Sequence, residues 1–358
     1  MVYTTKSIAA PVAENVDILG SAPSTAVLPS CGTFLETAMY IASFCEEAYT
    51  DLMTSVGLEE LAVYESTGAE VVYEAEEEGA AEATDAKKNL DAKTDNFLKN
   101  IWERIKKMFE TAVKWISDKV NEWKKNLKEN KITKFDDLWT KKSANIPNDK
   151  KFGKASFITK IAITDEKSII IDGEKYIEDI TATANKFANG ENPEIAVKVY
   201  GKTYNNFADI KKAIYDNAKE KEPVEITKDW ITKHKAEIGW LVVDGKSLGE
   251  VKKLYGDAKK AINVIAKNVK SNKKATENYK SVMAGIAKCS AILSGICGAE
   301  LDIAKNRYVE ASRILADALN AVLKAPKAAE EKKDEKAEAQ EATGESAVIA
   351  GIEEAFNW

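Results

Sequence analysis

The sequence predicts a mostly α protein with a small α+β domain, long amphipathic helices and disordered acidic ends. Two long stretches, residues 94–129 and 276–323, repeat apolar residues at spacings of three and four, the period of an amphipathic helix. Between residues 150 and 250, short β-branched runs are separated by turn signals such as Asp172-Gly173, which is typical of strands. Acid-rich stretches of low complexity lie near both ends and bury too little apolar surface to offset their ordering entropy.

The charge is sorted along the 358-residue chain. Residues 1–83 carry one Lys against fifteen acidic residues, a net −14, whereas residues 84–326 carry 47 Lys and Arg against 34 acidic residues, a net +13. Residues 327–358 carry four Lys against nine acidic residues, a net −5, so the three blocks sum to the −6 of the whole chain. A basic body between acidic ends favours non-specific association with polyanions such as DNA.

The first 93 residues divide into an arm, a helix and a linker. Residues 1–30 are rich in Pro, Ser, Thr and Ala and are predicted to be extended, whereas the apolar spacing that follows predicts a helix that stops near Gly57. The arm and this helix form an N-terminal unit, residues 1–64, which is a candidate propeptide. Residues 65–93 are predicted to be an acidic linker, because Glu, Ala and Gly dominate the segment and it lacks apolar periodicity.

Residues 94–129 form the clearest predicted helix, within a region that extends to residue 149. One apolar stripe runs along it without a Pro or Gly, and another helix, a partner protein or lipid must cover this stripe. Protein packing is favoured over lipid, because five acidic residues reduce the charge of residues 97–129 to +4. The side chains predicted to form this packing or partner face are Phe97, Ile101, Trp102, Ile105, Phe109, Ile116 and Trp123.

Residues 150–250 are predicted to form the small α+β domain. The candidate strands are residues 157–163, 168–171, 195–200 and 240–243. Two of them precede a Gly-Lys turn and an amphipathic helix, a weak internal repeat.

Residues 251–325 are predicted to be a C-terminal helical region. Small residues in the middle of its long helix, including Gly295 and Gly298, indicate close helix packing, with a local kink as the alternative. Residues 326–358 are predicted to be a charged tail that ends in an apolar peptide. The candidate docking residues of that peptide are Ile352, Phe356 and Trp358.

The residues that carry most enzyme chemistry are scarce or badly spaced. His234, the single His, stands between two Lys, and Cys31, Cys45, Cys289 and Cys297 contain no CxxC pair, so no catalytic, metal or cofactor site is predicted. Structural, reduced cysteines are the expected state. No stretch approaches the ~20 uninterrupted apolar residues of a spanning helix, so the sequence does not predict an integral membrane protein.

Gly245-Lys246-Ser247 invites a phosphate-binding interpretation. It precedes a predicted helix as a P-loop does, but Trp240 stands where the first Gly of that motif belongs. A nucleotide-dependent enzyme built on this turn is therefore an alternative that the sequence supports weakly, and a tight turn is the simpler interpretation.

Three features together resemble internal virion or prohead-core proteins of large tailed bacteriophages. They are the segment Asn96–Phe109, the long alanine-rich helix that ends with Asn306–Leu315, and short tripeptides that end in Glu, such as Ala80-Ala81-Glu82. The resemblance implies a non-enzymatic structural component of the virion, made in the host cytoplasm, that self-associates or packs with other virion proteins.

Prohead proteases of that group cut after Glu in such tripeptides. The resemblance therefore implies processing at Glu65, Glu74, Glu82 and Glu354. Removal of residues 1–82 would change the net charge from −6 to +8, which suits contact with packaged DNA. A membrane-active protein that acts through the helix at residues 94–129 is the other alternative.

Overall fold

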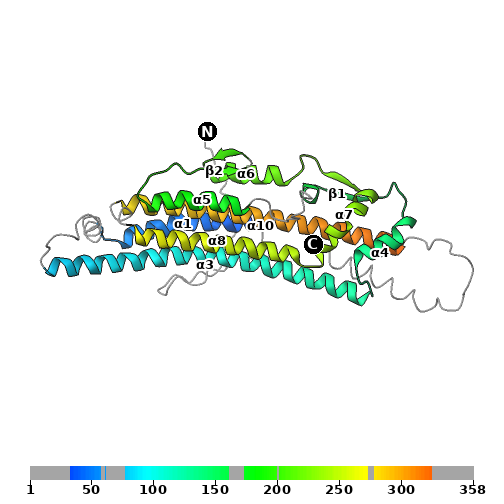
Figure 1. Ribbon diagram of the computed structural model, residues 1–358, viewed down its shortest axis with the longest axis horizontal. Coiled ribbons are helices and arrows are strands. Elements are labelled where there is room, and N and C mark those ends of the chain that lie inside the picture. The colour runs from blue at the N-terminus through cyan, green and yellow to red at the C-terminus, as the bar shows by residue number, and fades with distance from the viewer. Residues whose placement is uncertain are drawn as a thin grey trace, which may run out of the picture.

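The computed structural model describes residues 33–57, 61, 77–160, 173–199, 201–272 and 278–324. These residues form an elongated, mostly α bundle with a small α+β part, in which the long helices lie side by side along the long axis (Figure 1). The predicted arm at residues 1–30, the predicted strand at residues 168–171 and the charged tail from residue 326 lie outside the described residues.

Helix α1 spans Phe34–Ser55, so the predicted stop near Gly57 is confirmed. A capping box fixes its start, because the Thr33 hydroxyl accepts a hydrogen bond from Glu36 N and the Glu36 carboxylate accepts one from Thr33 N. Ala38, Ile41 and Cys45 on its inner face are fully buried. This packing argues against the removal of residues 1–64 as a simple propeptide, since α1 is part of the core.

Helix α3 spans Glu77–Glu129, which makes the prediction of a linker at residues 65–93 wrong from Glu77 onward. Two observations explain the earlier start. The added sequence is rich in alanine, the best helix former, and Leu90 is 1% exposed and belongs to the core. Thr94 lies inside the helix, where its hydroxyl donates to Leu90 O and lies 2.7 Å from Tyr279 Oη of α10.

Helix α10, Tyr279–Lys324, is the centre of the bundle. It contacts α1, α3, α5 (Gly173–Ala188) and α8 (Lys246–Ser271), and α5 and α8 also contact each other. Among the described helices, α10 is long and apolar enough by length and composition to cross a membrane, but 83% of its apolar window is buried inside the protein. A core helix passes the same test, and burial on this scale is what a core helix shows.

The small α+β part consists of two separate antiparallel ribbons and short helices. Strand β1 (Lys151–Ala155) pairs with β4 (Val224–Thr227), and β2 (Val197–Val199) pairs with β3 (Lys202–Tyr204). Three helices accompany the ribbons: α4 (Phe135–Lys142), α6 (Phe207–Ala218) and α7 (Lys228–Val242). Their buried side chains join the same hydrophobic core as the long helices.

The strand predictions in this part have mixed outcomes. The strand at residues 195–200 is confirmed as β2, whereas residues 240–243 are the end of α7 and its cap. Ile231, Ile238 and Leu241 are buried at helical spacing, so the apolar run that resembled a strand is one face of a helix. In the segment 157–163, residues 158–160 form a single 3₁₀ turn and residues 161–163 lie outside the described part.

Candidate nucleic-acid interface

Lysines gather at one end of the bundle, which we call the basic end and define as residues 124–160. This segment carries eleven Lys against four acidic residues, a net +7, and ten of the eleven Lys are exposed. At the other end of α3, residues 77–99 carry four Lys against six acidic residues, a net −2. The C-terminal end of α3, α4, β1 and the end of α10 all lie at the right of Figure 1. Along α3 the charge therefore changes from net negative at its start to net positive at and beyond its end.

Buried aromatic rings hold the basic end in place. Trp139 of α4 is fully buried, and its ring centroid lies 5.9 Å from that of Phe135 and 5.8 Å from that of Phe152 on β1. Such offset and edge contacts add to the burial of large apolar area. This cluster joins α4 to the first strand, so the lysines on both elements have a fixed spacing.

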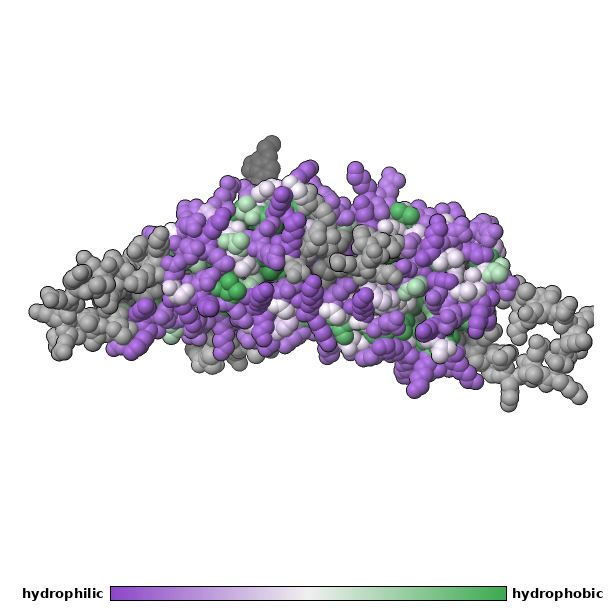
Figure 2. Space-filling view, viewed as in Figure 1, coloured by the Kyte–Doolittle hydropathy of each residue, from purple (hydrophilic) through white to green (hydrophobic). Residues whose placement is uncertain are grey.

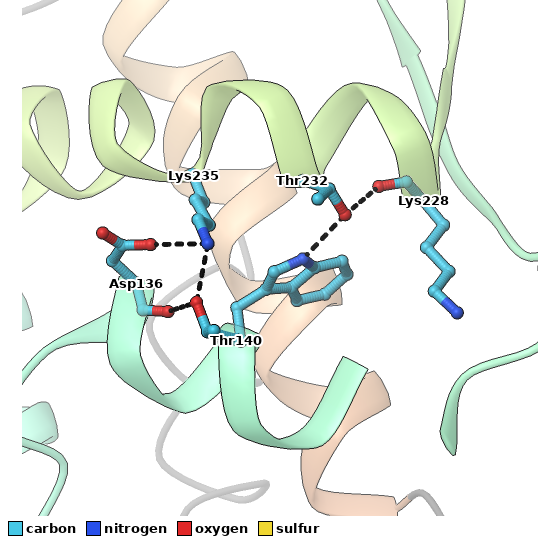
Figure 3. A network of polar contacts seen from close by, with 6 residues as sticks. Asp136, Thr140, Lys228, Thr232 and Lys235 are labelled. Atoms are coloured by element: carbon cyan, nitrogen blue, oxygen red, sulfur yellow. Dashed lines mark hydrogen bonds and ion pairs between the residues drawn. The ribbon is translucent and has the colours of Figure 1, made fainter. Parts of the chain in front are cut away.

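Polar contacts lock α4 against α7 (Figure 3). The Trp139 indole N–H donates to the Thr232 hydroxyl at 3.1 Å. Lys235 Nζ donates to the Thr140 hydroxyl at 2.6 Å and lies 3.1 Å from Asp136 Oδ1. These contacts use a lysine of α7 to neutralise one acidic residue of the basic end, which leaves the positive excess on the surface.

Helix α10 holds the backbone of the strand region. The Glu310 carboxylate accepts hydrogen bonds from the N–H groups of Ser156, Phe157 and Ile158 at 2.7–2.8 Å. Arg313 donates to the carbonyl oxygen of Lys154. A carboxylate bound by three N–H groups is a strong, charge-assisted anchor, so the chain that carries Lys150, Lys151 and Lys154 is fixed to the core helix.

A hollow of about 500 Å³ opens between the end of α10 and the chain before β1. Ile146, Phe152 and Ala321 contribute apolar walls, and Lys150, Lys151 and Lys324 also line it. Lys151 Nζ lies 2.8 Å from Glu225 Oε2 at an exposed position, where an ion pair is weak. Burial raises the pKa of the neighbouring Asp317 carboxyl, while Arg313 and Lys150 act in the opposite direction.

The surface chemistry suits phosphate groups. Exposed ammonium groups carried by an anchored backbone can neutralise backbone phosphates and release counterions, a mode of binding that reads no sequence. Figure 2 shows one long face on which hydrophilic side chains dominate and apolar ones form only small scattered groups. Ring stacking on bases is not an evident part of this interface, because Phe135, Trp139 and Phe152 are at most 3% exposed. The partly buried Phe157 ring meets Tyr215 edge to face, with 6.4 Å between the ring centroids.

The predicted packing face of α3 is covered by the chain itself. Phe97, Ile101, Ile105, Phe109, Ile116 and Trp123 are 0–4% exposed, and α3 contacts α8, α1 and α10. Trp102 is the exception, since it is only half-buried, with its ring centroid 5.4 Å from that of Tyr255 on α8. The sequence left open whether another helix, a partner protein or lipid covers this face. In the structure, other helices of the same chain cover it.

The Gly245-Lys246-Ser247 turn does not form a phosphate cradle. Gly245 has φ +75° and joins α7 to α8, which is a helix-to-helix turn rather than the strand-to-helix turn of a P-loop. The fully buried Ser247 hydroxyl donates to Leu241 O at 3.1 Å, and Lys246 Nζ lies 4.4 Å from the centroid of the Trp240 ring. Both side chains therefore make contacts with residues of α7.

The remaining candidate residues are dispersed. His234 lies 4.5 Å from the Trp230 ring centroid, and burial lowers its pKa. Cys45, Cys289 and Cys297 are buried free thiols. Within the described part of the chain, no three His, Cys, Asp or Glu side chains come together as a metal site would require.

The candidate processing and docking residues are mostly outside the structure. Glu82 lies within the helical span of α3, so a protease that needs an extended substrate would have to unwind the helix there. Glu65, Glu74 and Glu354, the docking residues Ile352, Phe356 and Trp358, and Cys31 lie outside the described residues.

Comparison with protein-family models, with curated proteins and with solved structures found no match to this chain.

Proposed function

We propose that this protein is a non-enzymatic structural protein that binds nucleic-acid phosphates through its basic end without reading sequence. The observation that carries the proposal is the net +7 of residues 124–160 at one end of a bundle whose other α3 end, residues 77–99, is net −2. A positive patch of this kind supplies most of the affinity in non-specific nucleic-acid binding.

The interior of the virion of a tailed bacteriophage is the proposed setting. Support comes from the sequence resemblance, from the long helical bundle and from a charge pattern suited to a DNA-filled shell. In that setting the other faces of the bundle would contact further copies or other virion proteins. Processing after Glu65 or Glu74 belongs to the same proposal, and it would leave α1 bound to α10 through their buried contact.

The two alternative functions have less support. A membrane-active role for residues 94–129 requires the apolar face of α3 to leave its contacts with α1, α8 and α10, at the cost of exposing its buried side chains. A nucleotide-dependent enzyme requires a phosphate cradle at Gly245, where Ser247 already bonds Leu241 O.

A charge-reversal pair on one helix tests the proposal. Lys124, Lys125 and Lys128 are exposed at the basic end of α3, and Lys87, Lys88 and Lys99 are exposed toward its other end. The triple variant K124E/K125E/K128E should bind duplex DNA at least tenfold more weakly than wild type. A plot of the logarithm of its affinity against the logarithm of salt concentration should also be less steep, by about one for each phosphate that it no longer neutralises. The matched triple K87E/K88E/K99E carries the same total charge and should bind nearly as wild type. Equal weakening in both variants would show that only the net charge matters and would overturn the assignment to this end.

A further inference from the structure

We infer that the hollow at the basic end is the docking site for the chain's own segment 337–358, which competes there with nucleic acid. The effect on nucleic acid rests on the proposed function, whereas the docking itself does not. Three observations support this: the composition of the hollow, the position of the last described residue, and the charge of the segment.

The hollow combines apolar walls with positive charge. Ile146, Phe152 and Ala321 line it together with Lys150, Lys151 and Lys324, and these three Lys outnumber the one acidic side chain of the lining, Asp317. Its volume of about 500 Å³ is within the range of sites that bind a compact ligand or a few side chains. A ligand suited to it has aromatic or aliphatic groups flanked by carboxylates.

The last described residue of the chain lies at this same place. Lys324 is both the last residue of α10 and a residue of the hollow. Ala337 lies thirteen positions after Lys324, and an extended chain of that length reaches about 45 Å. The segment is therefore tethered close to the hollow, and a tether of this kind gives an effective concentration of about millimolar.

The segment has the matching chemistry. Residues 327–336 carry four Lys and four acidic residues and are neutral, whereas residues 337–358 carry five acidic residues and no Lys or Arg. Two of those acids, Glu353 and Glu354, stand beside the apolar residues Ile352, Phe356 and Trp358. Opposite charge and apolar anchors thus meet at one site, and the acidic segment would occupy the surface that phosphates need.

Hydrogen exchange of the full chain tests the docking. We expect backbone amides of residues 348–358 to exchange at least tenfold more slowly than in a free peptide of the same sequence. The variant K150E/K324E should abolish this protection by reversing two charges of the hollow. The matched variant K87E/K88E, at the other end of α3, should retain it. Free-peptide exchange rates in the wild type, or protection that survives K150E/K324E, would overturn the docking site.

DNA binding separates this inference from the proposed function. The variant F356S/W358S lies outside the described core, so the fold should persist, and its affinity for duplex DNA at low salt should rise about threefold to tenfold because the competitor is released. Unchanged affinity in a protein that does bind DNA would overturn the competition. If residues 348–358 are protected from exchange but the protein binds no DNA, the docking site is supported and the proposed function is contradicted.

Discussion

Gly298 of α10 lies directly against Ala38 of α1. A Cβ atom placed on Gly298 would lie 2.5 Å from Ala38 Cβ and 2.8 Å from the carbonyl oxygen of Phe34, closer than carbon atoms pack. The two helices therefore approach backbone to backbone at this point, and the small-residue run in α10 serves close packing. Helix α10 continues as one helix through Gly295 and Gly298.

Substitution of Gly298 by Ala should destabilise the protein by about 1–3 kcal/mol, the usual cost of overpacking a filled core. Gly249 of α8 is the matched control, since nothing lies within 4 Å of a Cβ placed there. Gly249→Ala should instead stabilise by about 0.5–1 kcal/mol through helix propensity. Urea unfolding of the two variants measures both values, and equal effects of the same sign would contradict the close approach.

Replacing Phe109 with Ala should lower the free energy of unfolding by about 3–5 kcal/mol. The side chain is 1% exposed, and its ring meets Tyr255 edge to face at 5.5 Å, so the truncation leaves a cavity between α3 and α8. Met39→Ala is the control on α1, because Met39 is 52% exposed and should change stability by less than about 0.5 kcal/mol. An unchanged melting curve for Phe109→Ala would mean that α3 does not pack on this core.

The Asp302 carboxylate holds the start of α1 by accepting hydrogen bonds from Phe34 N at 2.8 Å and Leu35 N at 2.9 Å. Burial nevertheless raises the pKa of Asp302 above its ordinary value of 3.8, while these two N–H groups act to lower it. A raised pKa means that the folded state binds a proton more tightly than the unfolded state, so this group contributes stability at low pH.

Asp302→Asn removes this titration. The difference in unfolding free energy between wild type and Asp302→Asn should therefore fall as pH rises from about 3.8 through the raised pKa, and then level off. Denaturant unfolding across that pH range measures the difference. A difference that grows with pH would show that the N–H donors outweigh burial and that the folded pKa is lowered.

The buried thiols should not react with thiol reagents in the folded protein. Burial raises the pKa of Cys45 and of Cys289 to about 12 and that of Cys297 still further, so the reactive thiolate is scarce at pH 8. A thiol reagent followed by peptide mass mapping should leave all three unmodified in the folded protein and modify them after unfolding in guanidinium chloride. Fast labelling of Cys297 in the native state would contradict the described core.

The sequence predicts the helical part of the fold well, because apolar residues recur there at the helical period over stretches too long for a strand. The stripe at residues 94–129 fixes both the helix and its buried face, and only its start was misplaced. The earlier start at Glu77 agrees with the alanine content of the added segment and with the burial of Leu90 in the core. The burial of Leu90 is a tertiary contact that local composition does not reveal. The prediction of a strand at residues 240–243 is wrong for a related reason, since a short apolar run fits a strand and a buried helix end equally well.

The candidate interface was less predictable. The sequence shows that the body is basic, but not that the lysines of residues 124–160 share one end of the bundle. That placement depends on Trp139, on the Glu310 carboxylate bound to three N–H groups, and on the Arg313 contact with Lys154. The Glu310 and Arg313 contacts join residues more than 150 positions apart, and no local pattern signals them.

The salt dependence of duplex-DNA binding by the full chain tests the central claim most directly. We expect the logarithm of the affinity to fall linearly with the logarithm of salt concentration, with a slope of about −0.9 for each phosphate neutralised, and unrelated sequences to give the same line. Absence of binding at about 50 mM salt, an affinity that salt does not change, or a strong preference for one sequence would contradict it.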